Sequence, residues 1–152
     1  MGCRGARPDS GRRQRSMIGI DTNVLLRWLV RDQLIGEPAS AQSEALSALF
    51  DKSEEAFFIN EIVVVEIAWV LKQRVRLPKA RIAEIIWGLL NLENAVVKDR
   101  DILSAALQAY SEFPGDFSDH LIGEINSRNG CRTTMTFDKA ASKSSHFTEL
   151  TR

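Results

Sequence analysis

Short apolar runs alternate with longer segments of helical periodicity in this chain, and this alternation restricts its fold more than any other feature. The runs at 17–20, 56–59, 95–98 and 131–136 are typical of short strands. The segments between them repeat apolar residues every three or four positions, as amphipathic helices do. Strands that alternate with helices predict an α/β domain with a mostly parallel sheet.

Turn and cap residues delimit the expected helices. Asn60 is expected to cap a helix over 61–76, and Pro78 to begin the next one. Pro114–Gly115 separates two further helices, and Asn129–Gly130 ends the second of them. The tryptophans occupy core-like helical positions and are interpreted as packing residues rather than base-stacking platforms.

The formal net charge of zero over 152 residues hides an asymmetry. Residues 1–16 carry five arginines and one aspartate, so the remainder of the chain is net negative. We interpret 1–16 as a disordered basic arm, either a start-site extension or an expression leader, with a nucleic-acid-binding arm as the rival reading. Residues 17–152 are expected to form one domain. No apolar run has transmembrane length and the two cysteines lack metal-ligand spacing, so a cytoplasmic protein without membrane contact is expected.

Acidic residues follow the expected strands closely. Asp21 comes directly after the first strand, Glu66 lies on the helix after the second, and Asp138 stands just past the fourth. Asp116 and Asp119 begin the helix before the fourth strand. Ligands of a parallel sheet bind beyond the carboxyl ends of its strands, so these five residues are expected near one edge.

Each carboxylate also has a purely structural interpretation. Asp21 is a possible helix cap, Asp116 and Asp119 suit a helix N-terminus, and Asp138 suits a turn. Glu66 is the single charge in "IVVVEIAWVL", where burial would be costly without a partner or a metal. His120 and His146 are interpreted as non-catalytic.

Clustering favours a metal site. Two carboxylates at about 4 Å repel by roughly 4 kcal/mol at an effective dielectric near 20, so a group of them needs protons or a divalent cation. Carboxylate oxygens suit Mg²⁺ or Mn²⁺, which can activate water for attack on a phosphodiester. An aspartyl phosphatase is disfavoured, since Thr22 and Asn23 follow Asp21 where its second aspartate would be needed.

The order of these segments resembles the PIN-domain ribonucleases, and within them the VapC-type toxins of type II toxin–antitoxin systems. The resemblance runs from Met17 to about Leu150 and rests on "IDTNVLLRWLV", "NEIVVVEIAWVL", "DFSDHLIGEINSRNGC" and "TTMTFDKAA". It implies a three-layer α/β/α sandwich with a mostly parallel central sheet. Around Asp119 the chain is more polar than these toxins usually are.

The resemblance also implies roles for single residues. Asp21, Glu66 and Asp119 match the three main metal ligands, and Asp138 matches a fourth, more variable one. Asn23 and Thr136 match supporting polar residues. Asp116 either reaches the metal or only caps the helix, and the cap is the favoured interpretation.

A metal-dependent endoribonuclease that uses Mg²⁺ or Mn²⁺ is therefore the leading hypothesis. Arg27, Arg31 and the basic run 72–81 are candidate RNA contacts, although the run could equally be a solvated helix end. The resemblance implies a cognate antitoxin and a homodimer as well. Two alternatives stay open: a PIN nuclease that processes RNA without being a toxin, and a catalytically inactive PIN module that binds RNA. The RNA target, the number of metal ions and the antitoxin are not predicted.

Overall fold

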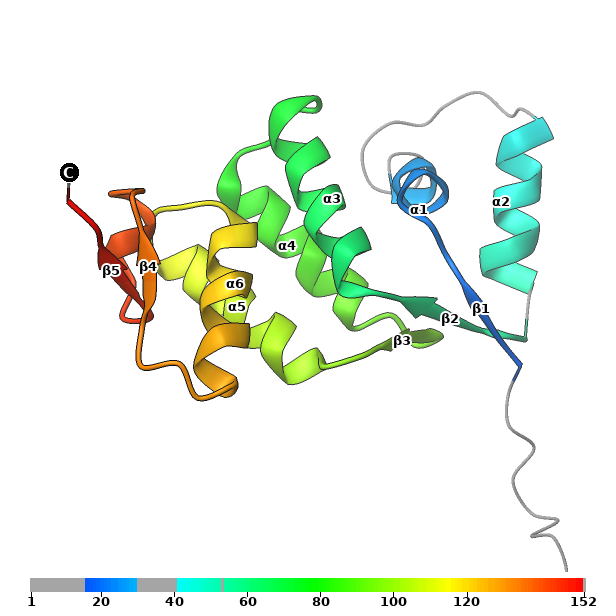
Figure 1. Ribbon diagram of the computed structural model, residues 1–152. Helices are drawn as coiled ribbons and strands as arrows, with labels where there is room; N and C mark the ends of the chain where they lie inside the picture. Colours follow the sequence, from blue (N-terminus) through cyan, green and yellow to red (C-terminus); the bar gives the residue numbers. More distant parts are fainter. Residues whose placement is uncertain (1–15, 30–40, 53, 152) are drawn as a thin grey trace, which may run out of the picture.

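A computed structural model describes residues 16–29, 41–52 and 54–151 (Figure 1). The predicted arm, except for Ser16, lies outside these residues, and so does Arg31. The elements are β1 (Met17–Gly19), α1 (Thr22–Leu29), α2 (Ala41–Lys52), β2 (Ala56–Ile59), α3 (Glu61–Gln73), α4 (Lys79–Leu90), β3 (Ala95–Val97), α5 (Arg100–Glu112), α6 (Phe117–Arg128), β4 (Thr134–Thr136), the 3-10 turn η2 (Ala141–Lys143) and β5 (Phe147–Glu149).

The strands form two parallel sheets. One has the order β1-β2-β3, with Ile18 opposite Phe57 and Phe58 opposite Val96. The other joins β4 to β5, with Met135 opposite Thr148. The α/β class with parallel strands is confirmed. The separation of β4 and β5 into a second sheet was not predicted, and because of it Asp138 follows a strand that does not belong to the sheet of β1.

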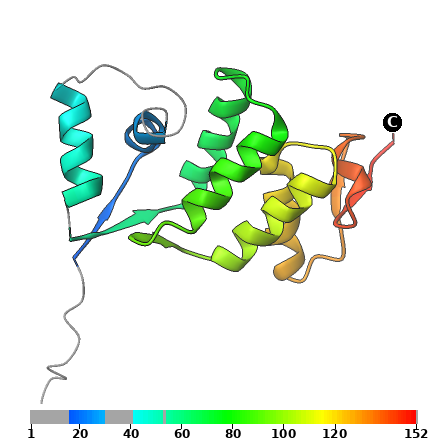
Figure 2. The same cartoon turned by 180° about the vertical axis from the view of Figure 1, so that it is seen from behind.

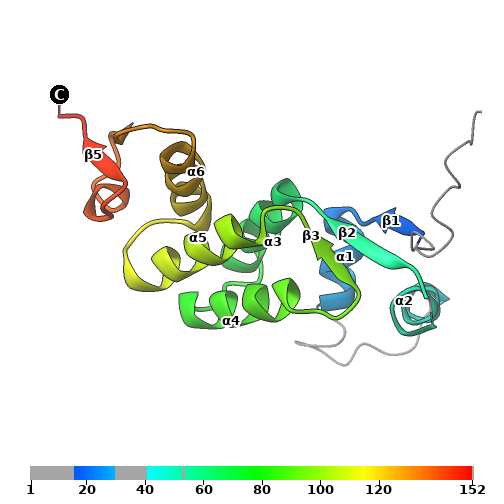
Figure 3. The same cartoon turned by 90° about the horizontal axis from the view of Figure 1, so that it is seen from below.

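Helices α3 to α6 lie between the two sheets (Figures 1 and 3), and the view from behind shows the same arrangement (Figure 2). Their facing sides form most of the hydrophobic core, to which α1 adds Leu25 and Leu29. The strand β2 alternates between the core and a half-buried face, with Phe57 and Ile59 buried. Helices α3 to α6 therefore separate the three-stranded sheet, beside which α1 and α2 lie, from the two-stranded sheet (Figures 1 and 3).

Local signals place the helix ends where the sequence predicts them. The Asn60 side chain accepts a hydrogen bond of 3.1 Å from the Val63 N–H, which caps α3. Helix α4 begins directly after Pro78. Gly115 has φ +113° in the turn between α5 and α6, a conformation that side chains with a Cβ rarely adopt. None of the helices in the described part of the chain has the length and hydropathy of a membrane span.

Candidate active site

The first two predicted carboxylates are connected through Thr22. Asp21 lies just past β1, and its Oδ1 accepts a 2.9 Å hydrogen bond from the Val24 N–H, so it caps α1. The Thr22 hydroxyl donates a 2.6 Å hydrogen bond to Glu66 Oε2 on α3. The junction of β1 and α1 thus holds the Glu66 carboxylate through the residue that follows Asp21. Sequence reasoning missed Thr22, although a hydroxyl directly after Asp21 was a usable signal.

Glu66 lies on an exposed face of α3, so its carboxylate does not carry the cost of burial that its apolar neighbours in sequence suggested. Ile62 is 68% exposed and Trp69 is 55% exposed on this face. The opposite face of α3 enters the core through Val63, Val64, Ile67, Ala68 and Leu71. Since α3 is apolar almost all round, its periodicity could not show which face would be buried.

The tryptophans differ from one another. Trp28 is half-buried and stacks on Phe50, with the ring centroids 4.8 Å apart, which agrees with a packing role. Trp69 and Trp87 are more than half exposed, so their interpretation as core residues is wrong.

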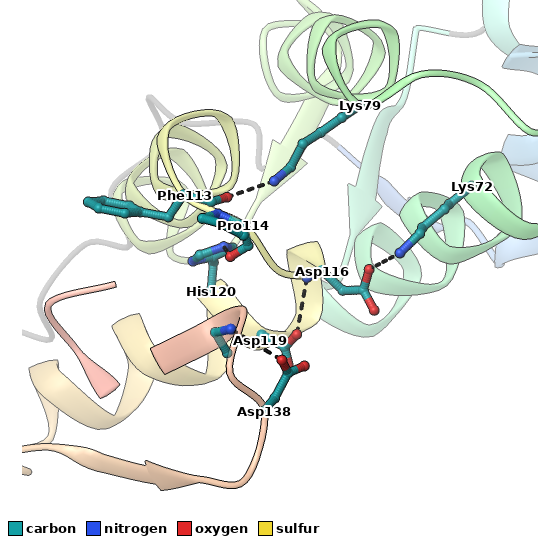
Figure 4. A network of polar contacts seen from close by, with 9 residues as sticks. Lys72, Lys79, Phe113, Pro114, Asp116, Asp119, His120 and Asp138 are labelled. Carbon is teal, nitrogen blue, oxygen red and sulfur yellow. Dashed lines mark hydrogen bonds and ion pairs between the residues drawn. The ribbon is translucent and has the colours of Figure 1, made fainter. Parts of the chain in front are cut away.

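Asp116, Asp119 and Asp138 form a second acidic group (Figure 4). Asp116 is the N-cap of α6, and its backbone N–H donates to Asp119 Oδ2 at 3.1 Å as part of a capping box. Asp138 lies in the turn after β4, where its Oδ1 accepts from the Ala140 N–H at 2.8 Å. The capping and turn interpretations of these residues are therefore confirmed. Such hydrogen bonds fix the carboxylates in place without using all of their oxygen lone pairs.

Two lysines neutralise part of this acidic surface. Lys72 on α3 forms an ion pair with Asp116, and both side chains are about half exposed. Lys79 on α4 donates to the Phe113 carbonyl at 2.7 Å and lies 4.5 Å from the ring centroid of Tyr110. Burial lowers the pKa of Lys79, and the charge of Asp116 partly offsets this. Burial, followed by the Asp116 charge, raises the pKa of Tyr110.

The ion pair of Lys72 and Asp116 borders two cavities. One, of about 340 Å³, is lined by residues that include Glu66, Trp69 and Phe117. The other, of about 390 Å³, is lined by residues that include Lys79 and Asp138. Lys72, Asp116 and Tyr110 line both. The cavities therefore place Glu66 and Asp138 on either side of Asp116.

His120 supports the loop that leads into α6. It is buried, and its Nε2 lies 3.0 Å from the Pro114 carbonyl oxygen, which accepts the hydrogen bond in the neutral tautomer with a proton on Nε2. Its Nδ1 has no hydrogen-bond partner within the described residues. Burial lowers the pKa of His120, which favours the neutral ring.

His146 is tied to α6 by a 2.8 Å contact between its Nε2 and Glu124 Oε1. Both histidines therefore have structural contacts.

The supporting residues have different environments. The Thr136 hydroxyl accepts a 3.0 Å hydrogen bond from the Asp138 N–H and so helps to form the turn that carries Asp138. Asn23 is exposed on α1, and no hydrogen bond joins it to Asp21 in the part of the chain that the structure describes. Arg27 is exposed on the same helix.

The carboxylates have the right chemistry for a hard divalent cation, since they supply only oxygen ligands. Among residues 16–29, 41–52 and 54–151, however, no three Asp, Glu, His or Cys side chains lie close enough together to hold a metal ion. The reason is the sheet arrangement: β4 pairs with β5 and not with β1, so Asp138 and Asp21 do not meet at one sheet edge. The five carboxylates therefore form two groups, one of Asp21 and Glu66 and one of Asp116, Asp119 and Asp138.

The sequence of this protein matches the family model of the PIN domain over residues 18–145, which is most of the chain. The chain belongs to the PIN domain family. The match includes all five candidate carboxylates and supports the α/β fold. PIN domains are generally nucleases and usually depend on divalent metal ions, so this family makes the acidic surface beside Glu66 and Asp116 the candidate active site. No curated protein matches this PIN domain closely enough to add a finer relationship.

Proposed function

We propose that the protein is a metal-dependent endoribonuclease and acts as the toxin of a toxin–antitoxin pair. The observation that carries the proposal is the set of five carboxylates within a PIN domain, divided among the Thr22–Glu66 junction, the α6 capping box and the turn after β4. A binding module without activity would not need all of these acidic positions.

Asp21 and Glu66 in one group, and Asp119 and Asp138 in the other, would hold Mg²⁺ or Mn²⁺, with Asp116 as a further ligand or only as the helix cap. When bound, the cation lowers the pKa of a coordinated water and offsets negative charge on the phosphate. The protein's own bonds orient these side chains: Thr22 holds Glu66, the Asp116 N–H holds Asp119, and Thr136 supports the turn of Asp138. Asn23 would act as a polar neighbour of Asp21.

Binding of RNA requires positive charge on a surface that is otherwise acidic. Lys72 lies at the ion pair between the two cavities and can exchange its carboxylate partner for a phosphate oxygen when a cation occupies the acidic residues. Arg27 and Arg31 are proposed as further backbone contacts, Arg27 from the exposed side of α1. These contacts position RNA without reading its sequence.

A cytoplasmic toxin of this kind would be controlled by a cognate antitoxin and would form a homodimer. Both statements rest on the resemblance of "IDTNVLLRWLV" and "NEIVVVEIAWVL" to VapC-type toxins. Their test is expression in a bacterial host. Growth arrest by the wild type but not by Glu66→Gln would support the toxin. Metal-dependent cleavage in vitro without growth arrest would point instead to an RNA-processing nuclease.

Cleavage of an RNA pool by the purified protein, freed of any partner, tests the enzymatic claim. The reactions contain Mg²⁺, Mn²⁺ or EDTA, with Asp21→Asn and Glu66→Gln alongside. Glu93→Gln is the matched control, because Glu93 is an exposed carboxylate in the turn before β3. We expect cleavage that needs metal, persists in the control and is lost in both site variants. Cleavage in EDTA, or full activity of either site variant, would contradict the proposal.

A further inference from the structure

The cavity beside Glu66 has an aromatic wall that the proposed hydrolysis does not use. This wall is Trp69, three residues after Glu66 on α3 and 55% exposed. Residues three apart on a helix are neighbours on its surface, so the indole lies next to the Glu66 carboxylate. Val65, Ala68 and Phe117 add apolar surface to the same cavity.

A single exposed tryptophan needs no special explanation, because folded proteins keep much apolar surface in contact with water. Trp69 differs in what surrounds it. The cavity that it borders, of about 340 Å³, is also lined by the charged residues Glu66, Asp116 and Lys72. An apolar wall and a few charged groups therefore converge in a space within the usual size range of ligand pockets.

We infer that this cavity binds one unpaired base of the RNA, next to the phosphodiester that is cleaved, with Trp69 as the stacking surface. The inference rests on the proposed function and adds the residue that positions one base of the substrate. Proteins that bind single strands stack bases on aromatic side chains, whereas a base inside a duplex cannot present its face.

The charges of the cavity fit the rest of the nucleotide. With its base on Trp69, the nucleotide extends its phosphate toward Lys72, while Glu66 and Asp116 lie on the side where the cation is expected. An ammonium group beside a phosphate gives affinity that is independent of sequence. By fixing the position of one base, Trp69 would determine which neighbouring phosphodiester lies next to the carboxylates.

A rival occupant is a second copy of the chain, since Ile62 is also exposed on this face of α3. The buried centre of an interface between proteins is depleted of charged residues. Here Glu66, Lys72 and Asp116 line the same cavity as the indole, which favours a charged ligand that has an aromatic part.

Binding of a fluorescent single-stranded RNA, about eight nucleotides long, tests the inference by anisotropy. Ca²⁺ replaces Mg²⁺, and a gel confirms that the RNA stays intact. We expect Trp69→Ala to weaken binding by about 5- to 150-fold, the range that stacking of one base implies. Trp69→Phe should retain most of the affinity. Trp87→Ala is the matched control, because Trp87 is 53% exposed on α4 and lines neither of the two cavities.

A second RNA, which lacks one base, identifies the group that is stacked. We expect one such abasic position to weaken binding to the wild type, and to have no further effect on Trp69→Ala. Unchanged affinity of Trp69→Ala, full additivity of the two losses, or no binding of single-stranded RNA by the wild type would overturn the inference. Conversion of a dimer into a monomer by Trp69→Ala, seen by size-exclusion chromatography, would assign the indole to an interface between copies.

The same experiments separate the inference from the proposed function. Binding that depends on Trp69 without cleavage in Mg²⁺ would refute the nuclease and leave the base pocket in place. Metal-dependent cleavage that is unaffected by Trp69→Ala would support the nuclease and refute the base pocket.

Discussion

The Thr22 hydroxyl donates a 2.6 Å hydrogen bond to Oε2 of Glu66, and this bond links the end of β1 to α3. It is the closest described connection between the first and second predicted carboxylate positions, because Asp21 directly precedes Thr22. The bond gives the carboxylate of Glu66 one orientation on an otherwise exposed helix face.

Replacing Thr22 by valine removes this bond while keeping the shape of the side chain. We expect ribonuclease activity to fall by about three- to tenfold, because a typical hydrogen bond contributes on the order of 1 kcal/mol. Thermal unfolding should change little, since the bond is exposed to water. Thr22→Ser keeps the hydroxyl and should retain activity. Equal activity of the valine variant would show that Thr22 does not orient Glu66.

Replacing Lys72 by methionine removes the ion pair with Asp116. Exposed ion pairs contribute about 0–1 kcal/mol, so the free energy of unfolding should change by no more than this. The remaining carboxylates become less neutralised, so the affinity for Mn²⁺ should rise and the affinity for RNA should fall. Titration of each ligand, at low and high salt, checks both directions. A fall in both affinities would indicate damage to the fold instead.

Acid should destabilise the protein partly through His120. Its pKa in the folded state is lowered by burial, so the unfolded chain binds the proton more readily. His120 therefore adds to the free energy of unfolding above the ordinary histidine pKa near 6.5, and this contribution is lost as the pH falls below that value. Urea unfolding between pH 5 and 8 should show a steeper loss for the wild type than for His120→Gln, in which the side chain cannot be protonated. Parallel curves would contradict this assignment.

Gly123 on α6 and Gly88 on α4 form a matched pair of helical glycines. A Cβ on Gly123 would lie 2.6 Å from a ring carbon of Phe147 on β5. A Cβ on Gly88 would have no described heavy atom within 4 Å, apart from its chain neighbours and the nearby backbone of α4. We expect Gly123→Ala to destabilise by about 1–3 kcal/mol through overpacking, and Gly88→Ala to stabilise by about 0.5–1 kcal/mol. Denaturant unfolding of the two variants measures the difference. Stabilisation by both would mean that β5 does not pack against α6 as described.

Local features of the fold could be predicted from sequence because short-range chemistry determines them. The strand at 56–59, the cap at Asn60 and the helix stop at Asn129–Gly130 each depend on a few adjacent residues. The partner of β4 could not be predicted in this way. Periodicity identifies a strand but does not specify its neighbour, and here β4 pairs with β5.

The site was predictable to the same extent. Asp21, Asp116 and Asp138 occupy the local positions that their neighbours in sequence indicate, as caps or turn residues. The exposure of Glu66 and Trp69 depends on which side of α3 packs against the other helices. Because α3 is apolar almost all round, its sequence does not indicate which side this is. Thr22 and Tyr110 belong to the site through contacts between elements that are distant in sequence.

The central claim is that the Asp21–Glu66 group and the group of Asp116, Asp119 and Asp138 both bind the divalent cations on which RNA cleavage depends. Titration with Mn²⁺, followed by electron paramagnetic resonance, tests it most directly with the wild type, Asp21→Asn, Asp138→Asn and the control Glu93→Gln. We predict that Mn²⁺ binding weakens in each aspartate variant and is unchanged in the control. Mn²⁺ binding at the wild-type affinity and stoichiometry in either aspartate variant would contradict the account.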